Sequence, residues 1–252
     1  MAPARITEPF VSVLSRPRTT LRLGICLAMV SLAVTGGVPT TAATNPASAP
    51  ATGKIDGIVR LVAPPGEPIR SGAYPSRNVP TSAAPTRASE IANVVVFVKD
   101  APRDGTLPAM RAQMRQQDEG FVPRLVAITR GSTVEFPNSD PFFHNVFSLS
   151  RGATFDLGRF PRGESRSRAF TRPGLVKVYC HLHSQMSAAI MVFDHSHFTI
   201  PEGNGHFSLA DVPAGEYRLS AWHERVGESS KPIVVTAGRT VTIEFALPVD
   251  SQ

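Results

Sequence analysis

Short apolar runs, separated by prolines and glycines, recur along most of the chain. Residues 55–62 alternate between apolar and polar positions, and residues 93–98 form a continuous apolar run; both patterns are typical of β-strands. Turn sequences separate the runs: Pro213-Ala214-Gly215 is one, and Arg130-Gly131 is another, which makes either a hairpin or a sheet corner. Further runs of this kind cover residues 125–129, 132–136, 175–180, 189–193, 207–209, 217–222, 232–236 and 240–247. The pattern predicts an all-β protein with β-sandwich architecture.

Two segments depart from this pattern. Residues 63–89 contain six prolines, which a sheet interior does not accept, so we expect a loop or an extended excursion there. The intrinsic propensities of residues 109–119 favour a helix, but the segment is short and its apolar face is thin. On propensity alone, this second segment is ambiguous between helix and strand.

The first residues read as a signal peptide. Arg16, Arg18 and Arg22 precede an apolar run over residues 23–34, and small residues follow it through residue 43. That run has about 12 residues, whereas a bilayer span needs roughly 20, so an uncleaved membrane anchor is the weaker alternative. We therefore predict a signal peptide over residues 1–43. The mature protein is expected to be periplasmic or otherwise exported, without stable membrane insertion.

Cleavage changes two features of the composition. The 252 residues carry a net charge of +6, of which residues 1–43 supply +3, and no Lys/Arg cluster suggests that the protein binds nucleic acid. Of the two cysteines, Cys26 leaves with the peptide and Cys180 remains. A single cysteine forms no internal disulfide, and a free thiol is a liability in an oxidising compartment. We therefore expect Cys180 to hold a ligand.

The chemistry of the chain is concentrated after residue 179. Cys180, His183 and Met186 bring a thiolate, an imidazole and a thioether into seven residues, a soft donor set suited to copper. Blue-copper sites use two histidines, one cysteine and a weak axial methionine, so a second histidine must come from elsewhere in the fold, and His144 is the candidate. A buried, inert cysteine is the alternative for Cys180.

Residues 109–194 resemble the cupredoxins, specifically the plastocyanin and amicyanin group. The motifs that carry the resemblance are Phe121-x-Pro123, Gly131-x-Thr133-Val134-x-Phe136-x-Asn138, His144-Asn145, Pro173-Gly174 before the strand to Cys180, and C-x-x-H-x-x-M. The resemblance implies a cupredoxin Greek-key β-sandwich over residues 109–194, with residues 109–119 as its first strand. It also implies that one copper ion is held by three equatorial ligands, His144, Cys180 and His183, and one axial ligand, Met186.

The resemblance and the local sequence together suggest roles for neighbouring residues. Asn145 is expected to bond the two ligand loops together. Ser184 follows His183 where the amicyanin-like loop usually has proline, which leaves the rigidity of the loop, and so its reduction potential, open. His181 is expected at the surface, not as a ligand. The rings expected to surround His144 as an apolar collar are Phe142, Phe143 and Phe147.

The C-terminal part resembles a second family. Residues 203–207 and 211–219 follow the pattern D/N-G-x-F, then P-x-G-x-Y-x-L, of the carboxypeptidase regulatory-like (transthyretin-like) β-sandwich. Its usual opening strands correspond to residues 57–59 and 94–96, so we predict a discontinuous domain of residues 54–100 with 195–250, into which the cupredoxin is inserted. Within it, we expect His195 and His197 to be solvated in a loop; a second metal site there is the weaker alternative. Residues 222–224 are expected to be a packed strand end.

These observations favour a one-electron carrier that alternates between Cu(I) and Cu(II). A redox protein would dock transiently at the exposed edge around His183. A copper-binding or copper-delivery protein without redox cycling is the alternative. An enzyme is not expected, because a multicopper oxidase or nitrite reductase needs additional histidine pairs and the chain has seven histidines in all.

Overall fold

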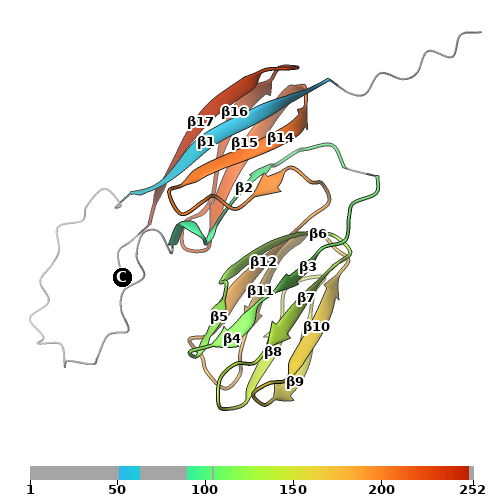
Figure 1. Cartoon of the computed structure of the whole chain (residues 1–252), viewed down its shortest axis with the longest axis vertical. Coiled ribbons are helices and arrows are strands. Elements are labelled where there is room, and N and C mark those ends of the chain that lie inside the picture. The colour runs from blue at the N-terminus through green and yellow to red at the C-terminus, as the bar shows by residue number, and fades with distance from the viewer. Residues whose placement is uncertain (1–50, 63–89, 104, 250–252) are drawn as a thin grey trace, which may run out of the picture. The chain divides into compact units, whose positions relative to one another are not determined.

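The protein is described by a computed structural model that covers residues 51–62, 90–103 and 105–249 (Figure 1). The predicted signal peptide (1–43) and the proline-rich segment (63–89) lie outside the described residues. The described residues form seventeen β-strands, which confirms the all-β prediction. No helix among them has the length and apolar character needed to cross a membrane.

One group of strands comes from the two ends of the described chain. Figure 1 shows β1 between β14 and β17, and β1 runs antiparallel to β14 and parallel to β17. A four-stranded sheet has the order β13-β2-β15-β16. The strands are β1 (Thr52–Val62), β14 (His206–Pro213), β17 (Thr240–Pro248), β13 (Phe198–Thr199), β2 (Val94–Val98), β15 (Gly215–His223) and β16 (Gly227–Val235).

Apolar and polar side chains alternate along β1 because successive residues point to opposite faces of the sheet. Ile55 and Val59 are buried in one apolar cluster, together with Phe207 and Phe245 from the neighbouring strands. A Cβ atom at Gly57 would lie 2.4 Å from the Phe207 ring and 2.3 Å from a backbone oxygen, so only glycine fits there. The glycine thus allows close packing of Phe207 against β1.

The continuous apolar run of β2 is buried on both faces. Val94, Val96 and Val98 belong to the cluster that contains Ile55. Val95 and Phe97 belong to a second cluster, with Trp222, Leu125, Met191 and Phe193 among its members. β2 pairs with β13 and β15 and with no strand of residues 109–194 among the described residues.

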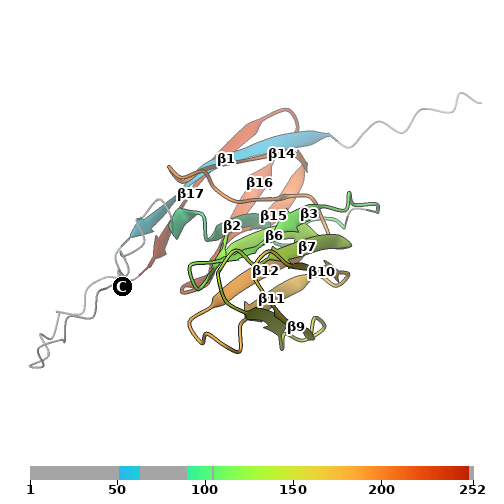
Figure 2. The same ribbon diagram turned by 60° about the horizontal axis from the view of Figure 1, so that its bottom comes forward.

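A second group of strands lies within residues 111–193. One layer is a five-stranded sheet with the order β6-β12-β11-β8-β9, and the other is a three-stranded sheet with the order β10-β7-β3 (Figure 2). These strands are β6 (Leu125–Thr129), β12 (Ser187–Phe193), β11 (Gly174–Tyr179), β8 (His144–Ser148), β9 (Phe155–Phe160), β10 (Ser165–Phe170), β7 (Ser132–Pro137) and β3 (Arg111–Gln113). A short hairpin joins β4 (Arg115–Gln117) to β5 (Gly120–Val122). The core between the layers contains Val134, Phe136, Val146, Val176 and Val178.

The structure resolves two open points of the sequence. Residues 109–119 contain strands, not a helix, because β3 pairs with β7 and places Ala112 beside Val134. Tertiary pairing therefore overrides the helical propensity of the segment. β6 and β7 belong to different sheets, so Arg130 and Gly131, with φ 86° at Gly131, form a sheet corner and no hairpin.

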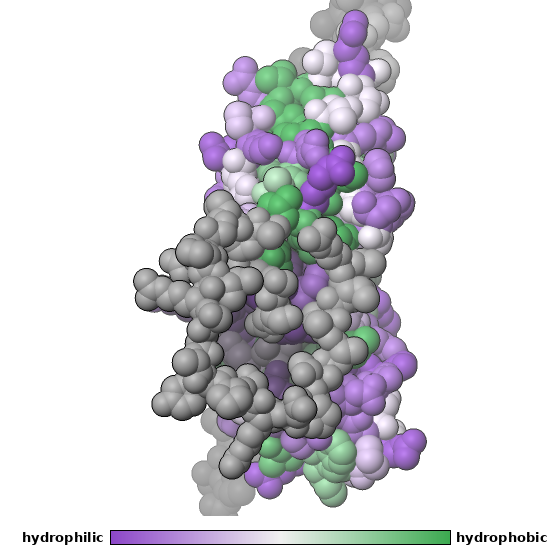
Figure 3. Space-filling view, turned by 90° about the vertical axis from the view of Figure 1, so that its left-hand side faces the viewer, coloured by the Kyte–Doolittle hydropathy of each residue, from purple (hydrophilic) through white to green (hydrophobic). Residues whose placement is uncertain are grey.

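One face of the described residues carries both hydrophilic and hydrophobic side chains (Figure 3). Figure 3 shows one face, on which hydrophobic side chains gather in small groups among polar ones. This is expected where each sheet turns one apolar face inward.

The end of β15 carries an ion cluster in which Glu90 and His223 are buried and Arg225 is exposed, and this agrees with the prediction of a packed strand end. The Glu90 carboxylate lies 3.2 Å from His223 Nε2 and 3.1 Å from Arg225 Nη2. His223 Nδ1 accepts a hydrogen bond from the Arg225 backbone N–H, so its Nε2 carries the proton that is donated to Glu90. Burial lowers the pKa of His223 below 6.5 despite the neighbouring Glu90.

We expect acid to destabilise the protein through His223. The unfolded chain binds a proton near pH 6.5, whereas the folded His223 binds it only at a lower pH. The stability that neutral His223 contributes is therefore full above about pH 6.5 and is lost as the pH falls from 6.5 to the folded pKa. Glu90 acts in the same direction at lower pH. Burial raises its pKa, but hydrogen bonds from Asn93 and His223 lower it further, to below 4.5.

Chemical denaturation between pH 8 and pH 5 measures this effect. His223→Gln should show a shallower loss of unfolding free energy with falling pH than the wild type. His206→Gln, the same change at an exposed histidine, should keep the wild-type slope. An unchanged slope in His223→Gln would contradict the assignment.

Candidate metal centre

Two neighbouring strands bring His144 and Cys180 together. β8 begins at His144, and β11 ends at Tyr179, the residue before Cys180. The strands are antiparallel and pair at Tyr179 and Phe147, so the start of one lies beside the end of the other. His144 is fully buried and Cys180 is 5% exposed.

The loop from Cys180 to Met186 is closed by its own backbone. The Cys180 N–H donates to the Met186 carbonyl at 3.4 Å, and the Met186 N–H donates to the His183 carbonyl at 3.0 Å. Met186 is buried and packs in the same core cluster as Cys180. The loop therefore holds the predicted axial residue next to the cysteine and leaves His183 half-buried.

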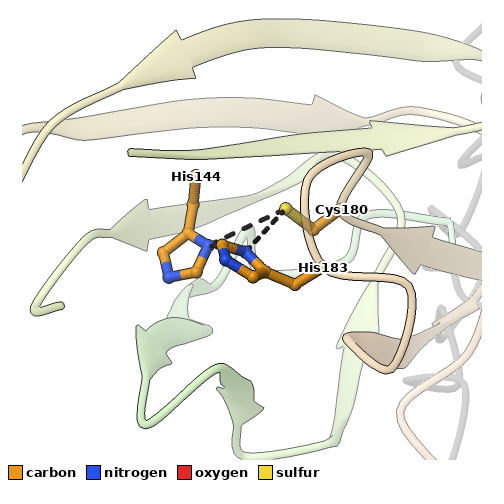
Figure 4. A group of neighbouring side chains, drawn as sticks. All are labelled: His144, Cys180 and His183. Carbon is orange, nitrogen blue, oxygen red and sulfur yellow. Dashed lines mark hydrogen bonds between the residues drawn. The ribbon is translucent and has the colours of Figure 1, made fainter. Parts of the chain in front are cut away.

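Three donor atoms face one another at the centre of the site (Figure 4). The Cys180 Sγ atom lies 3.8 Å from His144 Nδ1 and 3.9 Å from His183 Nδ1, and the two nitrogens are 3.0 Å apart. Among the described residues, these form the one cluster of three His, Cys or carboxylate side chains whose donor atoms lie this close together.

The triangle of donor atoms has the size of a metal site. For sides of 3.0, 3.8 and 3.9 Å, the point equidistant from all three corners lies about 2.1 Å from each, within the range of about 2.0–2.3 Å for metal bonds to His nitrogen and Cys sulfur. With the buried thioether of Met186, this donor set is typical of a type 1 copper site. The residues present therefore fit copper.

Asp140 contacts the far side of the His144 ring, a role that the sequence interpretation missed. Its Oδ2 atom lies 2.7 Å from His144 Nε2, and both residues are buried. The backbone N–H groups of Asp118 and Glu119 donate to Oδ1 and Oδ2, at 2.7 and 3.0 Å. The only signal in the sequence was the position of an acidic residue four places before the histidine.

This contact fixes the tautomer of His144. Burial raises the pKa of Asp140, but the hydrogen bonds from His144 and from the Glu119 and Asp118 backbone together outweigh it, so the pKa lies below 3.8. An ionised carboxylate only accepts, so His144 Nε2 carries the proton and Nδ1 presents its lone pair to Cys180 and His183.

Asn145 joins the two ligand loops, as the resemblance implied. Its Oδ1 atom accepts a hydrogen bond of 2.8 Å from the His181 backbone N–H, the residue after Cys180. Its Nδ2 group lies 3.3 Å from Asp156 Oδ1. The side chain thus ties the start of β8 to the loop that carries Cys180 and His183.

The aromatic collar is only partly as predicted. The ring centroid of Phe142 lies 5.1 Å from that of His144 and 5.3 Å from that of His183, so this side chain covers both imidazoles. Phe147 instead stacks on His181, with 3.7 Å between ring centroids. Phe143 is 54% exposed, and no ring contact joins it to either histidine among the described residues. His181 is exposed, as predicted.

The expectation for His195 and His197 was wrong in one respect. Both side chains are buried, not solvated in a loop. The His197 backbone N–H donates to His195 Nδ1, and the His195 ring packs 5.3 Å from the Phe193 ring. Within the described ranges, no third His, Cys or carboxylate group joins them at ligand distance.

No protein-family profile and no curated protein sequence matches the chain. Solved structures match part of it. A copper-containing nitrite reductase from Thermus scotoductus SA-01 is similar to 37% of this chain, with 24% identity and a TM-score of 0.32. The matched part spans only 25% of that enzyme's chain.

Two smaller proteins match over nearly their whole length. A purple cupredoxin from Nitrosopumilus maritimus has 23% identity and a TM-score of 0.30, over 32% of this chain and 99% of its own. Amicyanin from Paracoccus versutus has 19% identity and a TM-score of 0.31, over 39% of this chain and 97% of its own. The similar proteins thus include a nitrite reductase as well as a cupredoxin and amicyanin.

Proposed function

We propose that the protein is an exported type 1 copper protein that carries single electrons. The observation that supports this most directly is the triangle of His144, Cys180 and His183 donor atoms. His144, Cys180 and His183 would hold one copper ion equatorially, with Met186 as the weak axial ligand. The ion would supply the Cu(I)/Cu(II) couple.

The surrounding residues are suited to this role because they hold the ligands still. Asp140 fixes the ring of His144, and Asn145 ties the ligand loop to β8. Ligands that cannot rearrange keep the reorganisation on electron transfer small. His183 is the one half-buried member of the donor triangle, so the redox partner would approach on its side, in a weak and transient contact.

A spectroelectrochemical titration of the purified copper-loaded protein tests the proposal. We expect a visible band that disappears on reduction and returns on oxidation through a single one-electron wave. A protein that retains copper but does not cycle reversibly would instead be a binding or delivery protein.

We further propose that the strands outside residues 109–194 form one discontinuous domain, residues 54–100 with 195–250, of the regulatory-like type. The pairing of β2 with β15 and of β1 with β14 and β17 supports it. Export after cleavage of residues 1–43 is also a proposal. N-terminal sequencing of the protein from the periplasmic fraction should find a first residue close to 44, and an intact Met1 would contradict export by cleavage.

A further inference from the structure

The cupredoxin-like sandwich carries a concentration of arginine along one side. β9 and β10 are the edge strands of its two sheets and follow each other in the chain. Six arginines lie on these strands or in the turns beside them, and all six are exposed. We call this set the arginine edge: Arg151, Arg159, Arg162, Arg166, Arg168 and Arg172.

This edge carries most of the excess charge of the mature chain. Residues 151–172 hold six arginines against Asp156 and Glu164, a net charge of +4. The rest of the chain after residue 43 has sixteen Lys or Arg and seventeen Asp or Glu, which nearly cancel. The arginines do not form a continuous basic run in the sequence. Small, polar or apolar residues separate them along each strand, so the cluster becomes visible only in the folded chain.

Most of these arginines have no carboxylate partner. Among the described residues, only Arg166 of the six forms an ion pair, with Glu164 at 3.8 Å. Elsewhere in the described chain, Lys54, Lys99 and Arg124 are paired with carboxylates, whereas exposed arginines such as Arg130 and Arg218 stand singly. What distinguishes the edge is that its unpaired arginines lie close together in the chain. The arginine edge is therefore a surface whose positive charge the other described residues do not neutralise.

Two of the guanidinium groups are held in place by aromatic rings. Arg166 lies over the Phe160 ring at 5.4 Å and donates to the Leu157 carbonyl at 2.7 Å. Arg168 lies over the Phe155 ring at 5.6 Å. Stacked guanidinium groups lose less conformational freedom on binding than free side chains, which suits them to an interface.

One end of the edge is next to the metal centre. β9 pairs with β8, and the register places Phe160 opposite His144 and Arg159 opposite Asn145. Residues paired across an antiparallel ladder have Cα atoms about 5 Å apart. The arginine edge thus begins one strand away from a ligand of the proposed copper site.

From this placement we infer that the arginine edge is the part of the docking surface that attracts an acidic redox protein, which then receives or gives its electron on the neighbouring His183 side of the site. This inference rests on the proposed function, because electron exchange needs a partner beside the ligands. Charged side chains on edge strands also prevent unwanted strand pairing. A few charges of either sign are enough for that purpose, so it does not explain a net positive charge concentrated in 22 residues. Complementary charge raises association rates by steering the encounter.

Stopped-flow oxidation of the reduced, copper-loaded protein tests the inference. The probes are the trianion hexacyanoferrate(III), which takes one electron and becomes hexacyanoferrate(II), and the trication tris(phenanthroline)cobalt(III). A triple variant, Arg159→Glu, Arg162→Glu and Arg168→Glu, changes the edge from +4 to −2. The matched control makes the same change in net charge at three exposed arginines elsewhere, Arg130→Glu, Arg218→Glu and Arg239→Glu.

At low salt, we expect the edge variant to react about tenfold more slowly with hexacyanoferrate(III), and faster with the cobalt complex. The control should change the rate with hexacyanoferrate(III) by less than about twofold. At about 1 M salt, where charges are screened beyond about 3 Å, the edge variant and the wild type should react at the same rate. Poly-L-glutamate, added as a mimic of an acidic protein surface, should slow oxidation of the wild type but not of the edge variant.

Equal rates in the edge and control variants would overturn the docking surface while leaving the electron carrier intact. Sedimentation of the wild type, but not of the edge variant, with phosphatidylglycerol vesicles, without an effect of poly-L-glutamate, would assign the edge to a membrane surface instead. No electron exchange with either reagent in the wild type would refute the proposed function itself.

Discussion

Cys180→Ser should abolish the intense visible absorption of the copper-loaded protein. That absorption arises from charge transfer between a thiolate and copper, and Cys180 is the only sulfur in the donor triangle. A serine hydroxyl is a hard donor that is protonated at neutral pH, so copper retention should also fall. An absorption spectrum and metal analysis after gel filtration measure both effects.

Cys26→Ser is the matched control, because it removes the other cysteine of the chain. It should leave the spectrum of the mature protein unchanged, since Cys26 falls within the predicted signal peptide. A band of wild-type intensity in Cys180→Ser would show that the colour has another origin.

Asp140→Asn should weaken copper binding by about 10- to 100-fold, the usual effect of losing a partner that orients a ligand histidine. The Oδ2 atom accepts from His144 Nε2 and from the Glu119 backbone, and Oδ1 accepts from the Asp118 backbone. An amide has one oxygen, so its NH2 group must face one of these donors. His144 would then lose its fixed tautomer or the loop would shift.

The affinity is measured by competition with a copper chelator, and the tautomer by nitrogen NMR of His144 in the metal-free protein. Asp56→Asn, the same change on β1, should alter neither. Unchanged affinity together with an unchanged His144 tautomer in Asp140→Asn would show that the carboxylate does not orient the ligand.

The ligand loop was predictable from sequence because it is local. Cys180, His183 and Met186 lie within seven residues, so their spacing alone indicated a metal site. His144 lies 36 residues before Cys180, so it was selected by the need for a second histidine and by the resemblance to cupredoxins, not by local spacing. The structure places its Nδ1 atom 3.8 Å from the Cys180 sulfur.

Other features depended on contacts that a linear pattern does not contain. β9 and β10 were not predicted, because β10 buries only Phe170 and so lacks an apolar alternation. Asp140 lies four places before His144 in the sequence, but its role becomes clear only when its carboxylate is seen against the His144 ring. His195 and His197 resembled loop residues, but packing of the chain around Phe193 buries them.

Copper content and an electron paramagnetic resonance spectrum of the oxidised mature protein test the central claim most directly. The donor set of His144, Cys180, His183 and Met186 predicts one copper per chain, a strong visible band and a narrow parallel hyperfine splitting, because the thiolate delocalises the unpaired spin. A colourless copper-loaded protein with wide hyperfine splitting, or one that takes up no copper, would contradict it.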